Sequence, residues 1–504
     1  MLKTGVVLFV KNEVEDIASW IAWHAYCGFS TVIIYDDYST DGTWEVIHEA
    51  AKVFDVRTLR AADADQFNIR QQRTYIDALE RFREEFDWLL FLDSDEYLDI
   101  RDGSSVAEFL SQYPDANGVA LNWCCFGSGG HVIKPPTPIV FENYTTRSEP
   151  DFEYNYTTKS FVRPKQTDPV YINPHRFQVN GPYVTTDHQP VSWKDEHPDR
   201  TKTLAQWDVA RVHHYVIRSA QHYIEKMQRR VDIREAGIGM GLFIHCDRND
   251  HYDPTLPEQT DPMMVGLHRI QQQVNLALLN ETVENHRLVA PPASARNSLA
   301  AWAHNRFSAH IFQTVHDTTL CYEKGTGRLC HVNNPAADPR VEPLLAIAAT
   351  LWPNMIFLTT PDMIQPLFTS HDPRVSTVLS FKLERCDDNR VGFRNPITGL
   401  LTCFLKSDNL KDTMAGNRSR LQEWEKLEMK SILEPLPADI SNLFRTLDYV
   451  SAPSSLYPIT DPYKTADIFA AAVSLQLPED FALWRAMHIL SNVSWMQRHN
   501  PLSV

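Results

Sequence analysis

The stretch DWLLFLDSDE, residues 87–96, joins an unbroken apolar run to four acidic or small polar residues. A short apolar run bounded by charged residues is typical of a strand that is buried on both faces of a parallel sheet. We therefore predict a strand over DWLLFL, directly followed by Asp93. If the chain stays extended beyond this strand, Asp93 and Asp95 lie two residues apart and project to the same side.

Upstream of this stretch, three more apolar runs alternate with stretches of helical periodicity. The predicted strands are TGVVLFV (4–10), STVIIY (30–35) and VFDVRTL (53–59), and the predicted helices span residues 14–26, 44–51 and 66–86. This alternation indicates βαβ units and hence an α/β fold with a mostly parallel central sheet. Such a sheet binds ligands beyond the carboxyl ends of its strands. The motifs KNE, DDYSTDG and DSDE all follow predicted strands and therefore lie at that edge.

The paired aspartates Asp93 and Asp95 supply two hard oxygen ligands of the kind that Mg²⁺ and Mn²⁺ prefer. A cation held there would neutralise the charge that builds on a departing nucleotide diphosphate. An isolated DSD could equally be an acidic turn that caps the next helix. The motif DDYSTDG at the same edge favours the metal site, because Asp36 and Asp37 could accept hydrogen bonds from a nucleobase amide or from ribose hydroxyls, while Asp41 makes the turn.

Composition narrows the partners and the compartment. The 64 acidic and 48 basic side chains leave a net charge of −16, and no run of Lys or Arg forms a basic stripe, so nucleic acid is not expected as a partner. No apolar stretch is long enough to span a bilayer, and Gly5–Val10 is too short for a signal peptide. Eight cysteines, of which only Cys124 and Cys125 are adjacent, give neither a disulfide framework nor a zinc spacing. We expect a cytoplasmic protein that is at most peripheral to a membrane.

The chain of 504 residues exceeds the usual size of one hydrophobic core, so more than one domain is expected. We assign residues 1–252 to the α/β domain, 253–295 to a helical linker, 296–435 to a β-rich domain and 436–504 to a helical or loop-rich extension. The preferred boundary is the tract VAPPASA near Pro291.

The order of the motifs resembles the GT-A glycosyltransferases that include family 2 and, more closely, those of the family 92 type. Proteins of that type carry a KNE segment, a DD-x-S-x-D-G turn and a D-x-D-E motif. Four later blocks extend the resemblance to about residue 240: FGSGGH (126–131), IVFENYTTRSEP (139–150), KSFVRP (159–164) followed by His175, and HHYVIRSAQHYIEKMQRR (213–230). The resemblance implies a GT-A nucleotide-diphospho-sugar transferase fold and a metal-dependent, inverting glycosyltransferase. The implied donor is a nucleotide sugar, most often a UDP-sugar, and the acceptor a glycan or a lipid-linked hydroxyl group.

Position by position, the resemblance implies a donor site at the end of the first strand. Lys11, Asn12 and Glu13 would lie against the nucleotide, and Asp37 would face the base or the ribose. The cations that a diphosphate could recruit are Lys159, Arg163 and Arg218. Arg218 stands where the family has a lysine. The positive charge is kept, but a planar guanidinium group replaces a compact ammonium group. Lys159 and Arg163 could instead belong to a solvated strand face.

The metal site that the resemblance implies consists of Asp93, Asp95 and His214, with Mn²⁺ or Mg²⁺ as the cation. Asp93 would also contact the diphosphate. A neutral imidazole is a suitable further ligand for such a cation. The neighbouring His213 is then a packing or surface histidine.

An inverting transfer also needs a carboxylate or a histidine that takes the proton of the acceptor hydroxyl. The candidates in the second half of this domain are Glu142, His131, Glu153 and Asp187. Glu142 and His131 fall inside family-matching blocks, and we therefore predict one of them as the catalytic base. Trp123 and Phe126 could stack on a sugar face or simply fill a core.

The C-terminal half contains two segments with the pattern strand, Thr-Gly turn, strand. They are LCYEKGTGRLCHV (320–332) and VGFRNPITGLLTCF (391–404). Together with RLQEWEKLEM (420–429) they weakly resemble the strand pairs of a β-trefoil, such as the fascin or ricin-type lectin modules. The resemblance implies a β-trefoil-like domain that binds carbohydrate.

Two other functions stay open at this point. A sugar nucleotidyltransferase can also place paired aspartates and a metal on an α/β sheet, but it normally has a Gly-rich basic loop after its first strand, where this chain has KNEVED. The chain could also be a carbohydrate-binding protein without catalysis. Release of a nucleoside diphosphate from a nucleotide sugar distinguishes transfer from both alternatives.

Overall fold

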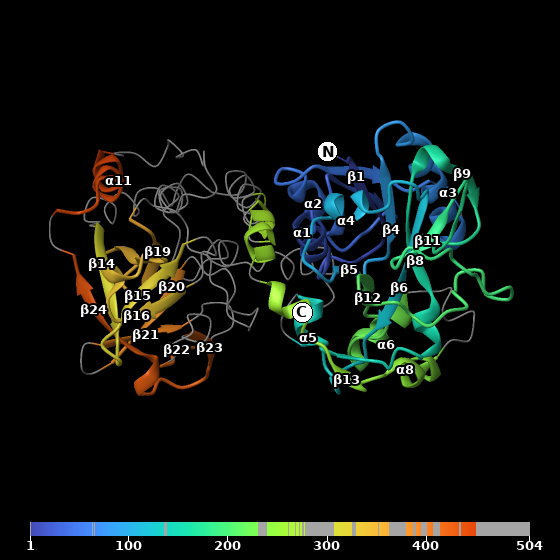
Figure 1. Cartoon of the computed structure of the whole chain (residues 1–504). Helices are drawn as coiled ribbons and strands as arrows, with labels where there is room; N and C mark the ends of the chain where they lie inside the picture. The colour runs from blue at the N-terminus through green and yellow to red at the C-terminus, as the bar shows by residue number, and fades with distance from the viewer. Residues whose placement is uncertain are drawn as a thin grey trace. The chain divides into compact units, whose positions relative to one another are not determined.

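The computed structural model divides the chain into two compact units, residues 1–270 and residues 271–494, which are described separately (Figure 1). The described residues are 2–62, 64, 66–135, 139–229, 239–260, 262–267, 269–271, 273–274, 277, 307–324, 329–350, 352–361, 380–386, 390–394, 401–406, 414–432 and 435–449. The predicted boundary near Pro291 and the predicted extension beyond residue 449 lie outside these residues.

The first unit is built on a nine-stranded sheet with the order β3-β2-β1-β4-β8-β6-β12-β5, to which β11 adds by pairing with β6. Its strands are β1 (Thr4–Val10), β2 (Thr31–Asp36), β3 (Val56–Arg60), β4 (Trp88–Leu92), β5 (Glu96–Ile100), β6 (Gly118–Cys125), β8 (Thr158–Val162), β11 (Tyr183–Thr185) and β12 (Ala210–His214). The strands β3, β2, β1 and β4 run parallel. In contrast, β8 is antiparallel to β4 and β6, and β5 is antiparallel to β12. The sheet is therefore mixed, and five of its eight strand pairings are parallel, in agreement with the mostly parallel sheet that the sequence predicted.

The predicted alternation of strands and helices before residue 93 is confirmed. The helices of this part are α1 (Ile17–Tyr26), α2 (Thr43–Ala50) and α3 (Phe67–Arg81). The other short elements of the unit are α4 (Val106–Ser111), α5 (Val140–Asn143), α6 (Ala220–Arg229), α8 (Met240–Cys246), η1 (Glu153–Tyr156), η2 (Pro164–Gln166), η3 (Pro257–Gln259) and the strand pairs β7 (Thr146–Arg147) with β13 (His251–Tyr252) and β9 (Thr167–Tyr171) with β10 (Phe177–Val179).

Both faces of the parallel strands are covered, which explains why their sequences are apolar at every position. Val7 and Phe9 of β1 belong to a buried cluster with Tyr75 and Phe82 from α3 and its C-terminal end. The alternate residues of β1 are also buried, and Figure 1 shows α1 and α2 on the side of β1 away from α3. The sheet therefore has a hydrophobic core on each face.

The first unit extends beyond residue 252, where the sequence placed the end of the α/β domain. The carboxylate of Asp253 pairs with Arg147 at 2.9 Å and with Arg211 of β12 at 2.8 Å. Leu256 and Met263 are buried as well. Ion pairs and apolar contacts thus join the segment after residue 252 to the sheet.

The second unit contains six strands that pair side by side in a closed ring. These are β14 (Phe307–Thr314), β18 (Leu345–Ala349), β19 (Met355–Thr359), β20 (Ser380–Arg385), β21 (Arg390–Arg394) and β24 (Lys426–Ser431), which pairs back with β14. The remaining elements are β15 (Thr319–Glu323), β16 (Leu329–Val332), β17 (Val341–Pro343), β22 (Leu401–Phe404), β23 (Met414–Arg418), η4 (Pro335–Ala337), η6 (Glu423–Glu425) and α11 (Ala438–Tyr449). The predicted β-rich C-terminal region is confirmed.

Alternate residues of the ring strands form the core of the second unit. Ile356 and Leu358 of β19, and Phe381 and Leu383 of β20, are spaced two apart and belong to the same buried cluster. This spacing is expected when every second side chain of a strand points to one face. The strands predicted in the two Thr-Gly segments pair as β15 with β16 and β21 with β22, while the turns themselves lie outside the described residues.

In the described part of the chain, no helix combines the length and the apolar character needed to cross a bilayer. The eight cysteines, all of them in described segments, form no disulfide.

The buried histidine of α1 predicts how stability changes with pH. His24 is fully buried, and burial lowers its pKa from 6.5 to about 3. The unfolded chain therefore binds a proton below pH 6.5 that the folded chain does not, and stability falls as the pH drops. We expect the stability difference between the wild type and His24→Gln to shrink by roughly 1.4 kcal/mol per pH unit between pH 6 and 4, measured by urea unfolding. His197→Gln, at an exposed position, is the control; equal pH dependence in both variants would contradict the argument.

Candidate active site

A cavity of about 330 Å³ lies at the carboxyl ends of β1 and β4, the edge predicted from the motifs. Its lining comes from segments far apart in the chain, namely Phe9–Glu13, Phe67, Gln71, Asp93–Asp95, Trp123, Pro174, His175, His214, Val216 and Lys226. The KNE motif, the DSD motif and His214 therefore meet at one site. This is the arrangement that the sequence predicted for them.

The DSDE tetrad forms a tight turn between β4 and β5, which corrects the predicted extended conformation. The backbone N–H of Glu96 donates to the carbonyl of Asp93 at 3.1 Å, and the Glu96 carboxylate accepts the backbone N–H of Asp93 at 2.7 Å. The indole N–H of Trp20 in α1 donates to the carbonyls of Asp93 and Glu96. These bonds make the turn, and Asp93 and Asp95 still line the same cavity.

Lys159 neutralises the inner side of this turn. Its ammonium group is completely buried and lies 2.7 Å from the Asp93 carboxylate and 3.1 Å from that of Glu96. Burial alone would lower the pKa of Lys159, but these two carboxylates outweigh it and raise that pKa above its ordinary value. Burial raises the pKa of Glu96, and the neighbouring Lys159 ammonium group opposes that rise. Lys159 thus acts as a buried charge partner and does not belong to a solvated strand face.

Asp95 is paired with a second lysine and with the predicted histidine. The ammonium group of Lys226 in α6 lies 2.7 Å from the Asp95 carboxylate, and Nε2 of His214 lies 3.7 Å from it. Burial alone would raise the pKa of Asp95, but Lys226 and then His214 lower it below its ordinary value. Burial lowers the pKa of His214 to about 4, so its imidazole is neutral near pH 7. The His214 ring packs against Trp123, with 3.9 Å between ring centroids.

The donor types at Asp95 and His214 suit Mn²⁺ or Mg²⁺, because a carboxylate and a neutral imidazole are suitable ligands. Nδ1 of His214 is buried and has no hydrogen-bond partner among the described residues. Within those residues, however, no three His, Cys, Asp or Glu side chains are arranged to hold a metal ion. Asp93 pairs with the buried Lys159, although its own side chain is 32% exposed. Asp95 and His214 could hold a cation only if Lys226, whose side chain is 19% exposed, left Asp95.

The KNE motif contributes one accessible cation to the cavity. Lys11 donates to the Asp37 carbonyl at 2.6 Å, and its side chain is 39% exposed. Asn12 adopts a left-handed conformation with φ of 54°, and the backbone N–H of Glu13 donates to Thr43. The chain therefore turns sharply at the end of β1 and presents Lys11 to Glu13 at the cavity wall.

Asp37 has a different environment from the one predicted. Its carboxylate is buried and accepts two hydrogen bonds from Arg70, at 2.5 and 2.8 Å. The neighbouring Asp36 is paired with Arg60. Neither aspartate is among the residues that line the cavity. Asp37 therefore positions Lys11 and Arg70, and a contact with a base or ribose stays a prediction.

The structure does not bring Arg163 or Arg218 to the cavity, contrary to the predicted diphosphate contacts. Arg163 follows β8 at the end that pairs with the start of β4, so it lies at the sheet edge opposite to Asp93. There it donates to the carbonyl of Ala116 and stacks over Trp88. Arg218 is buried in an ion pair with Asp16. Strand direction and burial thus remove both arginines from the site.

The two predicted bases also lie away from this cavity. His131 is exposed and packs its ring edge against Tyr144, and Glu142 lies in the short helix α5. Neither lines the cavity, so their catalytic role stays a prediction. His213 is confirmed as a packing histidine, because it is fully buried and contacts Asp99 at 3.1 Å.

Sequence reasoning assigned no role to three residues that the structure places at the site. Lys226 is the single lysine of the HHYVIRSAQHYIEKMQRR block, but only the fold brings it to Asp95. Gln71 of α3 donates to Asp93 at 3.4 Å. His175, which follows the KSFVRP block, is buried in the cavity wall, where its ring edge meets Trp123. Two of these three residues, His175 and Lys226, thus belong to the sequence blocks that resemble the family.

Comparison with known proteins supports the resemblance seen in the motifs. Residues 6–232 match the model of Glycosyltransferase family 92, which confirms that resemblance and the expectation of a glycosyltransferase in this part of the chain. A Glycosyltransferase family 92 protein of Oryza sativa subsp. japonica is 27% identical over 187 residues, which cover 34% of this chain and 29% of the relative. Another Glycosyltransferase family 92 protein, from Ricinus communis, is 28% identical over 193 residues, which cover 34% of this chain and 30% of that relative. The chain therefore spans less than a third of the length of these relatives.

Similar solved structures include S. aureus TarS 1–349 in complex with UDP, with 16% identity and a TM-score of 0.23 over 32% of this chain and 47% of that chain. HddC from Yersinia pseudotuberculosis has 11% identity and a TM-score of 0.23 over 37% of this chain and 91% of that chain.

The buried lysine predicts a large stability effect. Lys159→Met removes the positive charge but keeps the side-chain length, so it leaves the carboxylates of Asp93 and Glu96 uncompensated. We expect a loss of about 3–5 kcal/mol in the free energy of unfolding, measured by urea denaturation. Lys165→Met breaks an exposed ion pair with Glu84 and is the matched control, with little change expected. Equal stability of the two variants would contradict the role given to Lys159.

Proposed function

We propose that the first unit transfers a sugar from a nucleotide-diphospho-sugar, with a UDP-sugar as the first donor to test, to a hydroxyl group of a glycan or a lipid-linked acceptor. The observation that carries the proposal is the cavity in which the KNE and DSD motifs meet His214. The match of residues 6–232 to Glycosyltransferase family 92 supports the reaction class. We further propose that this unit is a GT-A-type domain, which the parallel β3-β2-β1-β4 half of the sheet supports.

The charges at the cavity suit the departure of a nucleotide diphosphate. Lys11 and Lys226 are partly exposed cations that line the cavity, and each could contact a phosphate oxygen. Their charge would stabilise the diphosphate more strongly as the bond to the sugar breaks. This role needs flexible, partly exposed lysines, whereas Lys159 is buried and keeps the acidic turn in place.

A divalent cation is part of the proposal, with Asp95 and His214 as its protein ligands. When bound, Mn²⁺ or Mg²⁺ supplies charge neutralisation at the leaving diphosphate. Lys226 would then move from Asp95 toward a phosphate. Asp93, held by Lys159, orients the turn that carries Asp95.

The stereochemical outcome and the base stay predictions. We retain inversion, with His131 or Glu142 as the base, from the family resemblance. A cytoplasmic location likewise stays a prediction. The rival reaction, nucleotidyl transfer, would release pyrophosphate from a nucleoside triphosphate, so one assay separates the two.

Asp95 provides the direct test of the proposed donor site. We expect the wild type with Mn²⁺ to release UDP from at least one UDP-sugar, and Asp95→Asn to lose about 100-fold or more of this rate, because the cation and His214 lose their charged partner. Excess EDTA should abolish the rate. The assay measures UDP release, with pyrophosphate release from UTP and a sugar phosphate measured in parallel.

Asp195→Asn is the matched control for this assay, because Asp195 is a highly exposed partner of Lys202. Its rate should equal that of the wild type. Full UDP release by Asp95→Asn would rule out the proposed site, and release that persists in EDTA would remove the metal from the proposal and leave Lys226 as the cation at Asp95.

We also propose that the second unit is a β-trefoil-like module that binds carbohydrate. The closed ring of six strands, with the pairs β15–β16 and β22–β23 attached to it, supports this fold. A cavity of about 620 Å³ next to β24 is lined by Arg418, Arg420, Gln422, Glu423 and Trp424. Trp424 is 53% exposed, and an exposed indole surrounded by polar side chains suits a sugar ring with its apolar face and its hydroxyls.

The exposed tryptophan makes this second proposal testable. We expect Trp424→Ala to abolish retention of the full chain on a panel of immobilised glycans, because the stacking surface is lost, while the UDP release of the first unit stays unchanged. Trp352 of the same unit is buried, so its indole ring offers no exposed face on which a sugar could stack. Unaltered retention of Trp424→Ala on every glycan that retains the wild type would contradict the proposal.

A further inference from the structure

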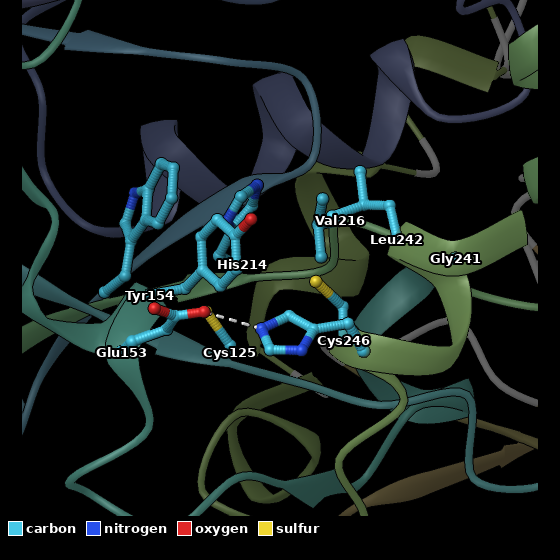
Figure 2. Close-up of a pocket in the computed structure, with 10 residues that line it drawn as sticks. Cys125, Glu153, Tyr154, His214, Val216, Gly241, Leu242 and Cys246 are labelled. Atoms are coloured by element: carbon cyan, nitrogen blue, oxygen red, sulfur yellow. Dashed lines mark hydrogen bonds and ion pairs between the residues drawn. The ribbon is translucent and has the colours of Figure 1, made fainter. Parts of the chain in front are cut away.

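A second cavity, of about 560 Å³, lies beside the proposed donor site in the first unit (Figure 2). It is formed by β6, by η1, by the end of β12 and by α8. Trp123, His214 and Val216 line both cavities, so the two share a wall. The proposed donor contacts and the two preferred bases, His131 and Glu142, lie outside this cavity, whereas Glu153, a further base candidate from the sequence, lines it.

The far side has a distinct chemical character. Tyr154 and Leu242 line it together with Trp123, so most of its surface is aromatic or aliphatic. Figure 2 shows Tyr154 and Glu153 entering from one side and Leu242 from the other. No lysine or arginine is among the residues that line this cavity, so it does not suit an anionic diphosphate.

One polar pair interrupts the apolar lining. Oε1 of Glu153 lies 2.8 Å from Nε2 of His245, which is the pair joined by the dashed line in Figure 2. Both side chains are accessible, with 57% and 40% of their surface exposed. The other carboxylate oxygen of Glu153 lies 4.0 Å from Arg200. The pair therefore presents a carboxylate and an imidazole, both partly exposed, to hydroxyl groups next to aromatic faces.

We propose that this second cavity binds the acceptor, and that the acceptor is a sugar residue of a glycan. The inference rests on the proposed glycosyltransferase function. A pyranose ring has an apolar face that packs on an aromatic ring and hydroxyls that bind carboxylates. The wall of Trp123 and His214 lets an acceptor hydroxyl approach the donor cavity while the rest of the sugar stays beyond it. Glu153 and His245 position the acceptor, and Tyr154 and Leu242 hold its apolar face.

Binding of methyl glycosides tests this assignment without relying on catalysis. The full chain, saturated with UDP and Mn²⁺, is mixed with methyl β-glycosides of galactose, glucose, N-acetylglucosamine, mannose, xylose and fucose, and saturation-transfer NMR measures contact with the protein. We expect the wild type to bind at least one of them. Glu153→Gln and Leu242→Ala should weaken that binding about tenfold or more, with UDP affinity unchanged within about twofold.

Two matched controls separate the cavity from general effects. Glu149→Gln breaks a Glu–His pair of the same length, Glu149 with His251 at 2.8 Å, which does not line the cavity. Ile244→Ala truncates an exposed residue of the same helix as Leu242. Both should bind the glycoside like the wild type.

The outcomes distinguish this inference from the function on which it rests. Loss of glycoside binding in Glu153→Gln and Leu242→Ala, but not in the controls, supports the acceptor cavity even if no UDP-sugar is turned over. Binding that is unchanged in both cavity variants, or no binding of any glycoside by the wild type, overturns it. Where UDP release is measurable, the KM for the stimulating glycoside should rise in the cavity variants while acceptor-independent UDP release stays constant. A fall in acceptor-independent UDP release would assign these residues to the donor site instead.

Discussion

The buried ammonium group of Lys159 is the contact on which the proposed donor site depends. It compensates Asp93 and the fully buried Glu96, which would otherwise place two carboxylates together in a low-dielectric interior. Trp20 holds the same turn from α1 through two backbone carbonyls. The acidic edge is therefore organised before any ligand binds, and Asp95, whose partner Lys226 is partly exposed, is the carboxylate that can exchange partners.

The mixed topology of the sheet places two different environments side by side. The parallel half ends in charged motifs, and the half built from β6 and β12 continues the surface with Trp123 and His214. On one side of these two rings the lining is charged, and on the other it is largely aromatic and aliphatic. A reaction between an anionic donor and an uncharged sugar needs this kind of separation, which is why we assign the two proposed substrates to the two cavities.

The second unit reaches its fold by a different route. Its ring closes because β24 pairs with both β14 and β21, so the ring itself has no open edge. Alternate side chains fill the interior, and polar residues with Trp424 remain at the outside. The proposed carbohydrate site therefore lies on segments that the closed ring holds in place.

The sequence by itself determined the parallel strands, the helices between them and the edge at which KNE and DSDE meet, because local burial on both faces leaves a continuous apolar pattern. Only the tertiary structure decided which basic side chains lie next to these motifs. Lys159 and Arg163 are four residues apart in one block, yet the antiparallel direction of β8 places one beside Asp93 and the other at the far edge, roughly 13 Å away along a strand. Lys226 reaches Asp95 across 131 residues of chain. Such pairings depend on strand direction and long-range packing, and a local pattern of residues carries no information about either.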